Sequence, residues 1–363
     1  MKGSAYLVCL FCLIIGLLLL FGVVSAAEQQ GLTAAGPEAP APAYTVGLVT
    51  DEYGVAGDVI NYLCYQGLLQ AESDLGVIGT VYTPTGSTDY GAKLQQCADE
   101  GNMLCIATAW SLREATSNAA SNNPARDFAI IDQSYDSYPD NLRGVQFAHD
   151  QAGYLAGVLA GHMTASDVLG DIGGMAIPPV DDFVFGYRNG AQCANPYARV
   201  LIEYANNFGS PVLGAEIAQA MIAQDADVIF APAGPTGVGS VVTATQSGVW
   251  GIGVDLDYYY TVFDGGALPG ADKLLSSAVK NFDNAVFHTI SETIHGGFIS
   301  GTVVYGLEVE GVGLAPFHDA DAAVPQSVRD ALAAAEAGII DGSIDLADDC
   351  RQYGYLPIAI KTE

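Results

Sequence analysis

Short runs of apolar and β-branched residues alternate along the chain with longer amphipathic segments. The first series begins near Tyr44 and predicts strands at 45–50, 79–83, 104–107, 128–132 and 142–147. Helical periodicity between these runs predicts helices that include 58–75 and 91–100. Such alternation is typical of parallel sheets whose strands are joined by right-handed crossovers.

A second series of the same kind follows a small-residue helix predicted at 150–163. Its predicted strands are 168–175, 200–204, 228–231 and 250–254, with helices at 180–194, at 214–224 and from 236. One sheet of more than about ten strands is unusual, so the pattern predicts an α/β protein with two doubly wound lobes. Open parallel sheets bind ligands at the carboxyl ends of their strands, and two facing sheets would form a ligand cleft.

The same pattern predicts how the chain is divided between the lobes. We assign residues 44–150, with a return segment at about 256–305, to lobe 1. Residues 151–255, with a C-terminal segment at about 306–363, are assigned to lobe 2.

Residues 1–43 have a different character. Lys2 precedes an uncharged apolar stretch at 5–27 that is long enough to cross a bilayer, so 1–27 is predicted to be a signal peptide or an N-terminal membrane anchor. Residues 28–43 are rich in Ala and Pro and predict a flexible linker. The folded part is therefore expected to be extracytoplasmic, tethered to the outer face of the cell membrane or secreted after cleavage.

The composition adds a strong acidic bias. The 363 residues include 41 Asp and Glu against 12 Lys and Arg, a formal net charge of −29. Such a field repels phosphate backbones, which excludes nucleic acid as a partner. We interpret the scattered acids as a solvated surface suited to a salty environment.

Five cysteines lie beyond the N-terminal segment: Cys64, Cys97, Cys105, Cys193 and Cys350. An exported protein can form disulfides, and Cys97 with Cys105 is the favoured local pair. The odd number leaves at least one cysteine unpaired. No CxxC or Cys/His spacing predicts a metal site.

Three predicted strands run directly into an aspartate, at Asp51, Asp132 and Asp255. One Asp at such a position is often only a cap for the next helix or turn, but three favour a shared site. Ionised carboxylates accept hydrogen bonds and do not donate them, so converging carboxylates suit a polyol such as ribose.

Other candidate ligand contacts lie at three further places. The strand at 228–231 leads to Gly234, at the glycine-rich start of a predicted helix. This segment lacks the Lys of a phosphate loop. We therefore interpret the glycines either as backbone N–H contacts to a neutral ligand or as a site of tight packing. Lys280 ends a β-rich run in a chain with few lysines, so we assign its ammonium a role as a donor to a ligand. Phe183 and Phe185 begin an aromatic-rich helix, where one ring can face the cleft and stack on a base.

The chain resembles the basic membrane protein family, which includes purine nucleoside receptor A, over roughly residues 45–345. The motifs that carry the resemblance occur in the expected order: GLVTD at 47–51, the helix start at Asn61 with Gly67-Leu68, 153–157, 173–196, 233–239, 251–255, and Ser277-x-x-Lys280. The resemblance implies a type I periplasmic-binding-protein fold with three hinge crossovers and a nucleoside, such as a purine nucleoside, held between the lobes. It implies the solute-binding protein of an ABC importer, with separate permease and ATPase subunits, no cofactor and no catalysis.

By motif position the resemblance implies polar ligand contacts at Asp51, Asp132, Asp255 and Lys280, with Phe183 on one face of the base. Asn61 and Gly234 complete the predicted ligand contacts. The first helix departs from the family pattern, because the family's Ser-Phe-Asn is Val59-Ile60-Asn61 here. Ile60 therefore stands where a second stacking ring is expected. Tyr53 and Trp110, which follow the first and third predicted strands, are candidates for that ring.

Two other function classes fit part of the pattern. Asp255-x-Asp257 and converging carboxylates are compatible with a nucleoside-processing enzyme, but the five histidines match no metal or base spacing and no nucleophile triad stands out. The nearer alternative is a type I binding protein or sensor for a sugar or another small polar solute. The export segment and linker favour delivery to a transporter.

Overall fold

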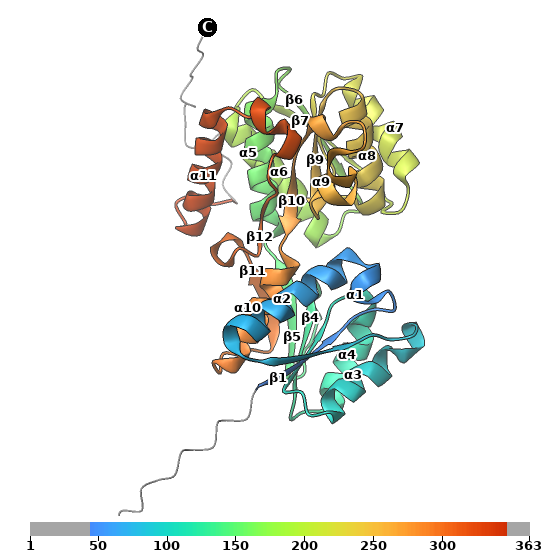
Figure 1. Ribbon diagram of the computed structural model, residues 1–363. Helices are drawn as coiled ribbons and strands as arrows, with labels where there is room; N and C mark the ends of the chain where they lie inside the picture. The colour runs from blue at the N-terminus through green and yellow to red at the C-terminus, as the bar shows by residue number, and fades with distance from the viewer. Residues whose placement is uncertain (1–43, 347–363) are drawn as a thin grey trace, which may run out of the picture. The chain divides into compact units, whose positions relative to one another are not determined.

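The strands of the described chain form two six-stranded sheets (Figure 1). The structure is a computed structural model that describes residues 44–346, so the predictions for 1–43 and for Cys350 lie outside the described residues. Sheet A has the strand order β11-β5-β4-β3-β1-β2, and sheet B has the order β12-β10-β9-β8-β6-β7. All pairs are parallel except the β10–β12 pair. The predicted α/β fold with two doubly wound lobes is confirmed.

Sheet A and its helices form lobe 1. Its strands are β1 (Thr45–Val49), β2 (Ile78–Tyr82), β3 (Leu104–Ala107), β4 (Asp127–Ile131), β5 (Leu142–Phe147) and β11 (Gly301–Tyr305). The helices α2 (Val59–Leu75) and α10 (Phe282–Ile294) cover one face, and α3 (Tyr90–Asp99) and α4 (Arg113–Asn122) cover the other (Figure 1). Alternate residues of β3 pack into the two faces, which explains why its run is apolar throughout.

Sheet B and its helices form lobe 2. Its strands are β6 (Val168–Gly173), β7 (Arg199–Tyr204), β8 (Val228–Phe230), β9 (Trp250–Asp255), β10 (Leu274–Lys280) and β12 (Val312–Leu314). One face is covered by α5 (His149–Met163) and α6 (Pro178–Ala194), and the other by α7 (Pro211–Ile222) and α8 (Gly234–Gln246). The short helices α1 (Gly54–Gly57) and α9 (Tyr258–Thr261) follow β1 and β9, and α11 (Gln326–Ile340) packs on α5.

The described chain crosses between the lobes three times. It crosses after β5 into α5, after β10 into α10, and between β11 and β12. The expected return segment at about 256–305 begins too early, because β10 pairs in parallel with β9 and so belongs to sheet B. The return to lobe 1 starts after Lys280, since α10 packs on α2 and on sheet A.

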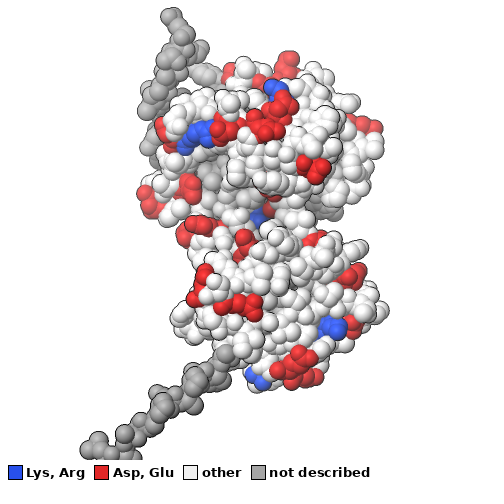
Figure 2. Space-filling view, in the orientation of Figure 1, with Lys and Arg blue, Asp and Glu red and all other residues white. Residues whose placement is uncertain are grey.

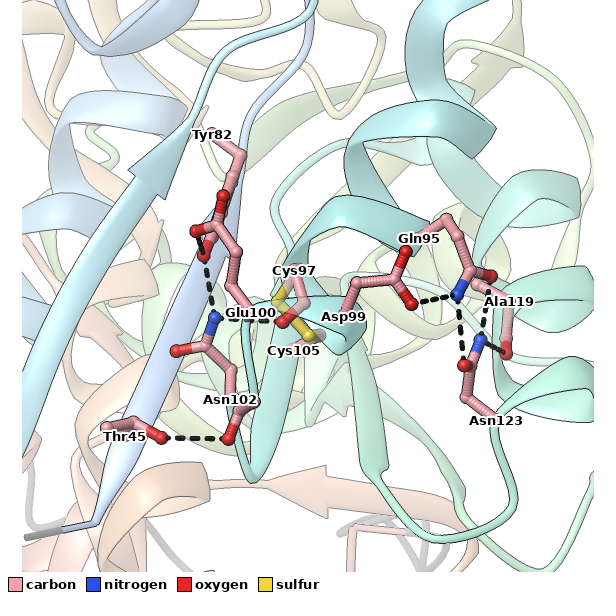
Figure 3. Close-up of a disulfide and its surroundings, with 11 residues drawn as sticks. Thr45, Tyr82, Gln95, Cys97, Asp99, Glu100, Asn102, Cys105, Ala119 and Asn123 are labelled. Atoms are coloured by element: carbon pink, nitrogen blue, oxygen red, sulfur yellow. Dashed lines mark hydrogen bonds between the residues drawn. A yellow bond between two sulfur atoms is a disulfide. The ribbon is translucent and has the colours of Figure 1, made fainter.

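The predicted disulfide between Cys97 and Cys105 is confirmed and joins the end of α3 to β3 (Figure 3). The turn between them is fixed by Asn102, whose amide donates to the Cys97 carbonyl and to the Tyr82 hydroxyl. Cys64 is a buried free thiol. Acidic side chains are spread over both lobes in the view of Figure 2, as expected for a solvated acidic surface.

The helices α5 and α6 approach each other so closely that glycine is required at their contact. A Cβ atom on Gly157 would overlap the carbonyl oxygen of Tyr187, and one on Gly190 would overlap that of Tyr154. Gly186 meets the Asp150 carbonyl in the same way. The glycines therefore hold α5, the helix that follows the first crossing, firmly to lobe 2.

Replacing Gly157 by alanine should therefore lower the free energy of unfolding by about 2 kcal/mol or more, because the two helix backbones must separate. Gly91→Ala is the matched control, since Gly91 is an exposed helical glycine on α3 and a methyl group added there would meet no neighbouring element within 4 Å. This control should be neutral or stabilising by about 0.5–1 kcal/mol. Urea unfolding measures both, and equal stability of the two variants would contradict the close contact.

One acid lies inside lobe 2. The side chain of Asp171 on β6 is fully buried, and neither carboxylate oxygen has a hydrogen-bond partner among the described residues. The Tyr187 hydroxyl is buried and unpartnered as well within the same described range. Burial raises the pKa of Asp171 well above its ordinary value, although the charge of Arg188 opposes the rise.

Asp171 should therefore make the protein less stable as the pH rises. From about pH 4 upward the unfolded chain releases this proton, whereas the folded chain keeps it until the pH passes the raised pKa. Asp171→Asn removes this proton linkage, so the variant should be more stable than the wild type by about 1–3 kcal/mol at pH 8 and should converge with it near pH 4. Parallel stability curves from pH 4 to 8 in urea unfolding would count against a raised pKa.

Candidate functional site

A cavity of about 390 Å³, which we call the cleft cavity, lies at the carboxyl ends of strands from both sheets. Its size falls in the range of small-molecule sites, about 300–1,000 Å³. Both lobes supply its walls, with Asp132, Gln133, Ser134 and Gln146 from lobe 1 and Ile177, Pro179, Val180, Phe183, Phe208, Pro232, Gly234, Val254, Asp255 and Lys280 from lobe 2. The structure thus brings together five residues predicted as ligand contacts: Asp132, Phe183, Gly234, Asp255 and Lys280.

A second cavity of about 330 Å³ lies between α3 and α4 of lobe 1. Its walls include Tyr90, Glu114 and Asn118 and contain none of the predicted ligand contacts. It is built on the outer helices and not on strand ends. The cleft cavity is therefore the candidate site, because open parallel sheets bind ligands at the carboxyl ends of their strands.

Asp132 and Asp255 occupy equivalent places in the two lobes. Each lies at the end of the third strand in its sheet's order, β4 in sheet A and β9 in sheet B. Both have a left-handed backbone, with φ of 58° and 65°. This conformation is uncommon outside glycine, and residues held in it often cluster at functional sites.

Lys280 joins these two carboxylates. Its Nζ donates a hydrogen bond to Asp132 Oδ2 at 3.0 Å and lies 3.1 Å from Asp255 Oδ1. The second contact is an ion pair without hydrogen-bond geometry, so the buried Asp255 Oδ1 has no hydrogen-bond partner among residues 44–346. Because Asp132 belongs to lobe 1 and Lys280 to lobe 2, the ammonium links the lobes.

The surroundings keep Lys280 protonated. Burial alone would lower its pKa, but the Asp132 and Asp255 carboxylates outweigh burial and raise the pKa above the ordinary value. Burial raises the pKa of Asp132, and the positive charge of Lys280 opposes that rise. The contribution of Lys280 to stability is therefore complete below about pH 10 and is lost only as the pH rises through its folded pKa.

Phe183 and Gly234 complete the predicted part of the site. Phe183 lies in the first turns of α6, which two prolines start, and its ring makes an edge contact with Phe230. The Lys280 ammonium lies 5.9 Å from the centre of the Phe183 ring. Gly234 begins α8 with φ of 55°, a conformation that favours glycine and lets the helix start directly beside the cavity.

Five other predicted contacts do not line the cleft cavity. Asp51 Oδ1 accepts hydrogen bonds from the Asn61 side chain at 2.8 Å and from the Tyr53 N–H. The side-chain Oδ1 of Asn61 accepts a hydrogen bond from the Thr108 hydroxyl. The side chain of Asn61 is 1% exposed, and its hydrogen-bond partners lie within lobe 1. Ile60 packs against the core. Trp110 and Tyr53 are exposed, and a ligand contact by any of the five remains a prediction.

Several residues that line the cleft cavity, or that contact its lining residues, were not among the predicted contacts. Gln133 and Ser134 directly follow Asp132, and Gln146 lies near the end of β5, so their positions at strand ends are a usable signal. Phe208, in the loop after β7, carries no such signal. The sequence pattern favours a surface or core position for His149, yet this residue contacts both Asp132 and Phe183.

Comparison with known proteins identifies the family. The sequence model of the ABC transporter substrate-binding proteins described as PnrA-like matches residues 44–344. The chain belongs to this family. Its members are substrate-binding proteins, so the chain is a binding protein and not an enzyme.

Curated relatives of this PnrA-like protein are similar over most of their length. The ABC transporter nucleoside-binding protein BmpA of Lactococcus lactis is 34% identical over 312 residues, which cover 82% of this chain and 87% of that protein. The CD4+ T-cell-stimulating antigen of Listeria innocua is 30% identical over 361 residues, 93% of this chain and 98% of that protein. Basic membrane protein D of Borreliella burgdorferi is 28% identical and matches 75% of this chain and 79% of its own length.

Solved structures show the fold. A solute-binding protein of an ABC transporter system from Aeropyrum pernix superposes with a TM-score of 0.62 at 22% identity, covering 83% of this chain and 92% of that chain. One from Conexibacter woesei has a TM-score of 0.65 at 20% identity and covers 85% of this chain and 99% of that chain. The predicted type I periplasmic-binding-protein fold is confirmed.

The family also bears on partners and location. An ABC transporter substrate-binding protein is extracytoplasmic, takes a small-molecule ligand and works with permease and ATPase subunits. Among residues 44–346 no helix has the length and apolar character needed to cross a bilayer.

Removing the lysine charge should expose the repulsion between the two aspartates of this PnrA-like protein. Lys280→Met is expected to lower the free energy of unfolding by about 2 kcal/mol at pH 8, because the two carboxylates then face each other without a cation. The loss should shrink as the pH falls towards about 4, where carboxyl groups take up protons. Urea unfolding at several pH values measures it.

The double variant Lys280→Met/Asp132→Asn is the control for this prediction. It removes one of the two repelling charges, so it should recover most of the stability lost in Lys280→Met. Equal stability of the single and double variants would contradict the repulsion between the Asp132 and Asp255 carboxylates.

Proposed function

We propose that this PnrA-like protein binds a neutral nucleoside, such as a purine nucleoside, in the cleft cavity and delivers it to an ABC importer. The observation that carries the proposal is that the Asp255 carboxylate, whose side chain is 40% exposed, lines the same cavity as the Phe183 side chain. A carboxylate oxygen accepts from ribose hydroxyls, and an aromatic ring suits a base. The Lactococcus lactis relative is named a nucleoside-binding protein, which supports the same ligand class.

The charge of the cavity favours a ligand without phosphate. Its charged lining residues are Asp132, Asp255 and Lys280, so the sum of their formal charges is one negative charge. The one lysine is already matched by two carboxylates. A phosphate group would lie close to these carboxylates with no unmatched cation among the lining residues, which disfavours nucleotides relative to nucleosides.

The second face for the base has three candidates. Phe208 lines the cleft cavity and is the candidate that needs no rearrangement. Tyr53 and Trp110 follow β1 and β3 at the ligand-binding edge of sheet A and are 66% and 75% exposed. Asp51 lies on the same edge, two strands from β4 in the sheet order, which corresponds to about 10 Å. We expect this edge to reach the ligand when the lobes close.

Binding of this kind requires closure around the three crossings, and no covalent chemistry. Ligand contacts made by both lobes favour the closed form, and the closed form is what the permease would recognise. The predicted anchor at 1–27 would keep the binding domain at the outer face of the membrane.

The Asp255→Asn variant tests the proposed ribose contact. Asparagine keeps the size of the side chain and tolerates a left-handed backbone, but its carbonyl is a weaker acceptor than a carboxylate. Its affinity for the preferred nucleoside should fall by at least about tenfold in calorimetry, which corresponds to about 1.4 kcal/mol. Asp225→Asn is the matched control, because Asp225 also has a left-handed backbone but is exposed outside the cavity.

The ligand itself is found by a thermal-shift screen of nucleosides, nucleoside monophosphates, free bases and sugars in high salt. A ligand of the native state raises the melting temperature by mass action. Nucleosides should do so and monophosphates should not. A response to sugars alone would reject the nucleoside assignment in favour of a sugar receptor.

A further inference from the structure

His149 lies at the first crossing between the lobes and contacts both of them. It is the first residue of α5 and follows β5 almost directly. Its ring meets the Phe183 ring of lobe 2 edge-on, with 5.0 Å between the ring centres. Its Nε2 lies 3.9 Å from Oδ1 of Asp132 in lobe 1.

The Nε2 atom is buried without a hydrogen-bond partner in the described part of the chain. The side chain of His149 is 3% exposed, and no described residue donates to or accepts from this nitrogen. The distance of 3.9 Å to Asp132 is beyond the hydrogen-bond range of about 2.7–3.2 Å. An unpaired buried polar atom costs free energy, so this conformation leaves a stabilising contact unmade.

The imidazole is neutral at physiological pH. Burial, with the positive charge of Lys280 as a smaller cause, lowers the pKa of His149 to about 2. A neutral imidazole carries one N–H, which can be on Nε2. Asp132 Oδ2 already accepts from Lys280, so Oδ1 is the oxygen left for His149.

We propose that His149 is a positioning residue of the ligand-bound form, in which Nε2–H donates a hydrogen bond to Asp132 Oδ1 as the lobes close. A relative shift of about 1 Å brings the two atoms into range. The bond holds the Asp132 carboxylate towards the ligand while the ring stays against Phe183. This inference rests on the proposed function. The hydrogen bond would form only in the closed form, and a contact made in only one of two forms shifts the equilibrium towards that form.

Two substitutions separate the hydrogen bond from the ring packing. His149→Phe keeps an aromatic ring against Phe183 but removes the donor, and His149→Gln keeps an N–H near the place of Nε2. His288→Phe is the control, because His288 is a partly buried histidine on α10 with ring contacts to Phe287 and Tyr305 and does not line the cleft cavity.

The expected result has opposite signs for binding and for stability. In His149→Phe the affinity for the preferred nucleoside should fall by about tenfold in calorimetry. The ligand-free melting temperature should be unchanged or higher, because an unpaired buried polar atom is gone. His149→Gln should keep the affinity to within about threefold, and His288→Phe should not change the affinity.

Two outcomes would overturn the proposal. One is wild-type affinity in His149→Phe. The other is a lower ligand-free melting temperature in His149→Phe than in His149→Gln, which would mean that Nε2 is already bonded without ligand.

If the wild type binds no nucleoside, the proposed function fails. The role of His149 in closure is then tested by single-molecule energy transfer between dyes on the two lobes. The ligand-free closed fraction should then fall in His149→Phe but not in His149→Gln, and an unchanged fraction in both would overturn the proposal.

Discussion

The ammonium of Lys280 between Asp132 and Asp255 is the interaction on which the candidate site depends. Two aspartates from equivalent strand ends of two sheets would repel each other across a cavity of this size. One buried ammonium lies 3.0 and 3.1 Å from these two carboxylates and offsets their repulsion. The lysine can do this because β10 ends beside the second crossing, at the border between the lobes.

Much of the fold could be predicted from local patterns, because parallel sheets with helices on both faces leave a strong period in the sequence. The strand-end rule pointed to Asp51, Asp132 and Asp255, of which Asp132 and Asp255 line one cavity with Lys280. The division between lobes could not be read in the same way. β10 resembles any other buried strand, and only its pairing with β9 shows that it completes sheet B.

Other parts of the site depend on contacts that a single sequence does not show. The sequence predicts a ligand contact for Asn61, but it does not show that Asp51, Gly54 and Thr108 use the side-chain amide of Asn61 within lobe 1. His149 follows Phe147 and Ala148 at the start of a helix and belongs to no metal or base spacing, so the sequence gives no reason to separate it from an ordinary core or surface histidine. What distinguishes it is its contact with Asp132, which the end of β4 in lobe 1 supplies, and with Phe183, which α6 of lobe 2 supplies.

The order in which the strands are made has a consequence for synthesis on the ribosome. Sheet A receives its sixth strand, β11, only after β6 to β10 of sheet B have been translated, and sheet B receives β12 later still. The outer edge of β5 therefore stays uncovered while most of the other lobe emerges, and an open strand edge can pair with the wrong chain. A nascent chain of this protein must keep that edge apart from its neighbours until β11 has been made.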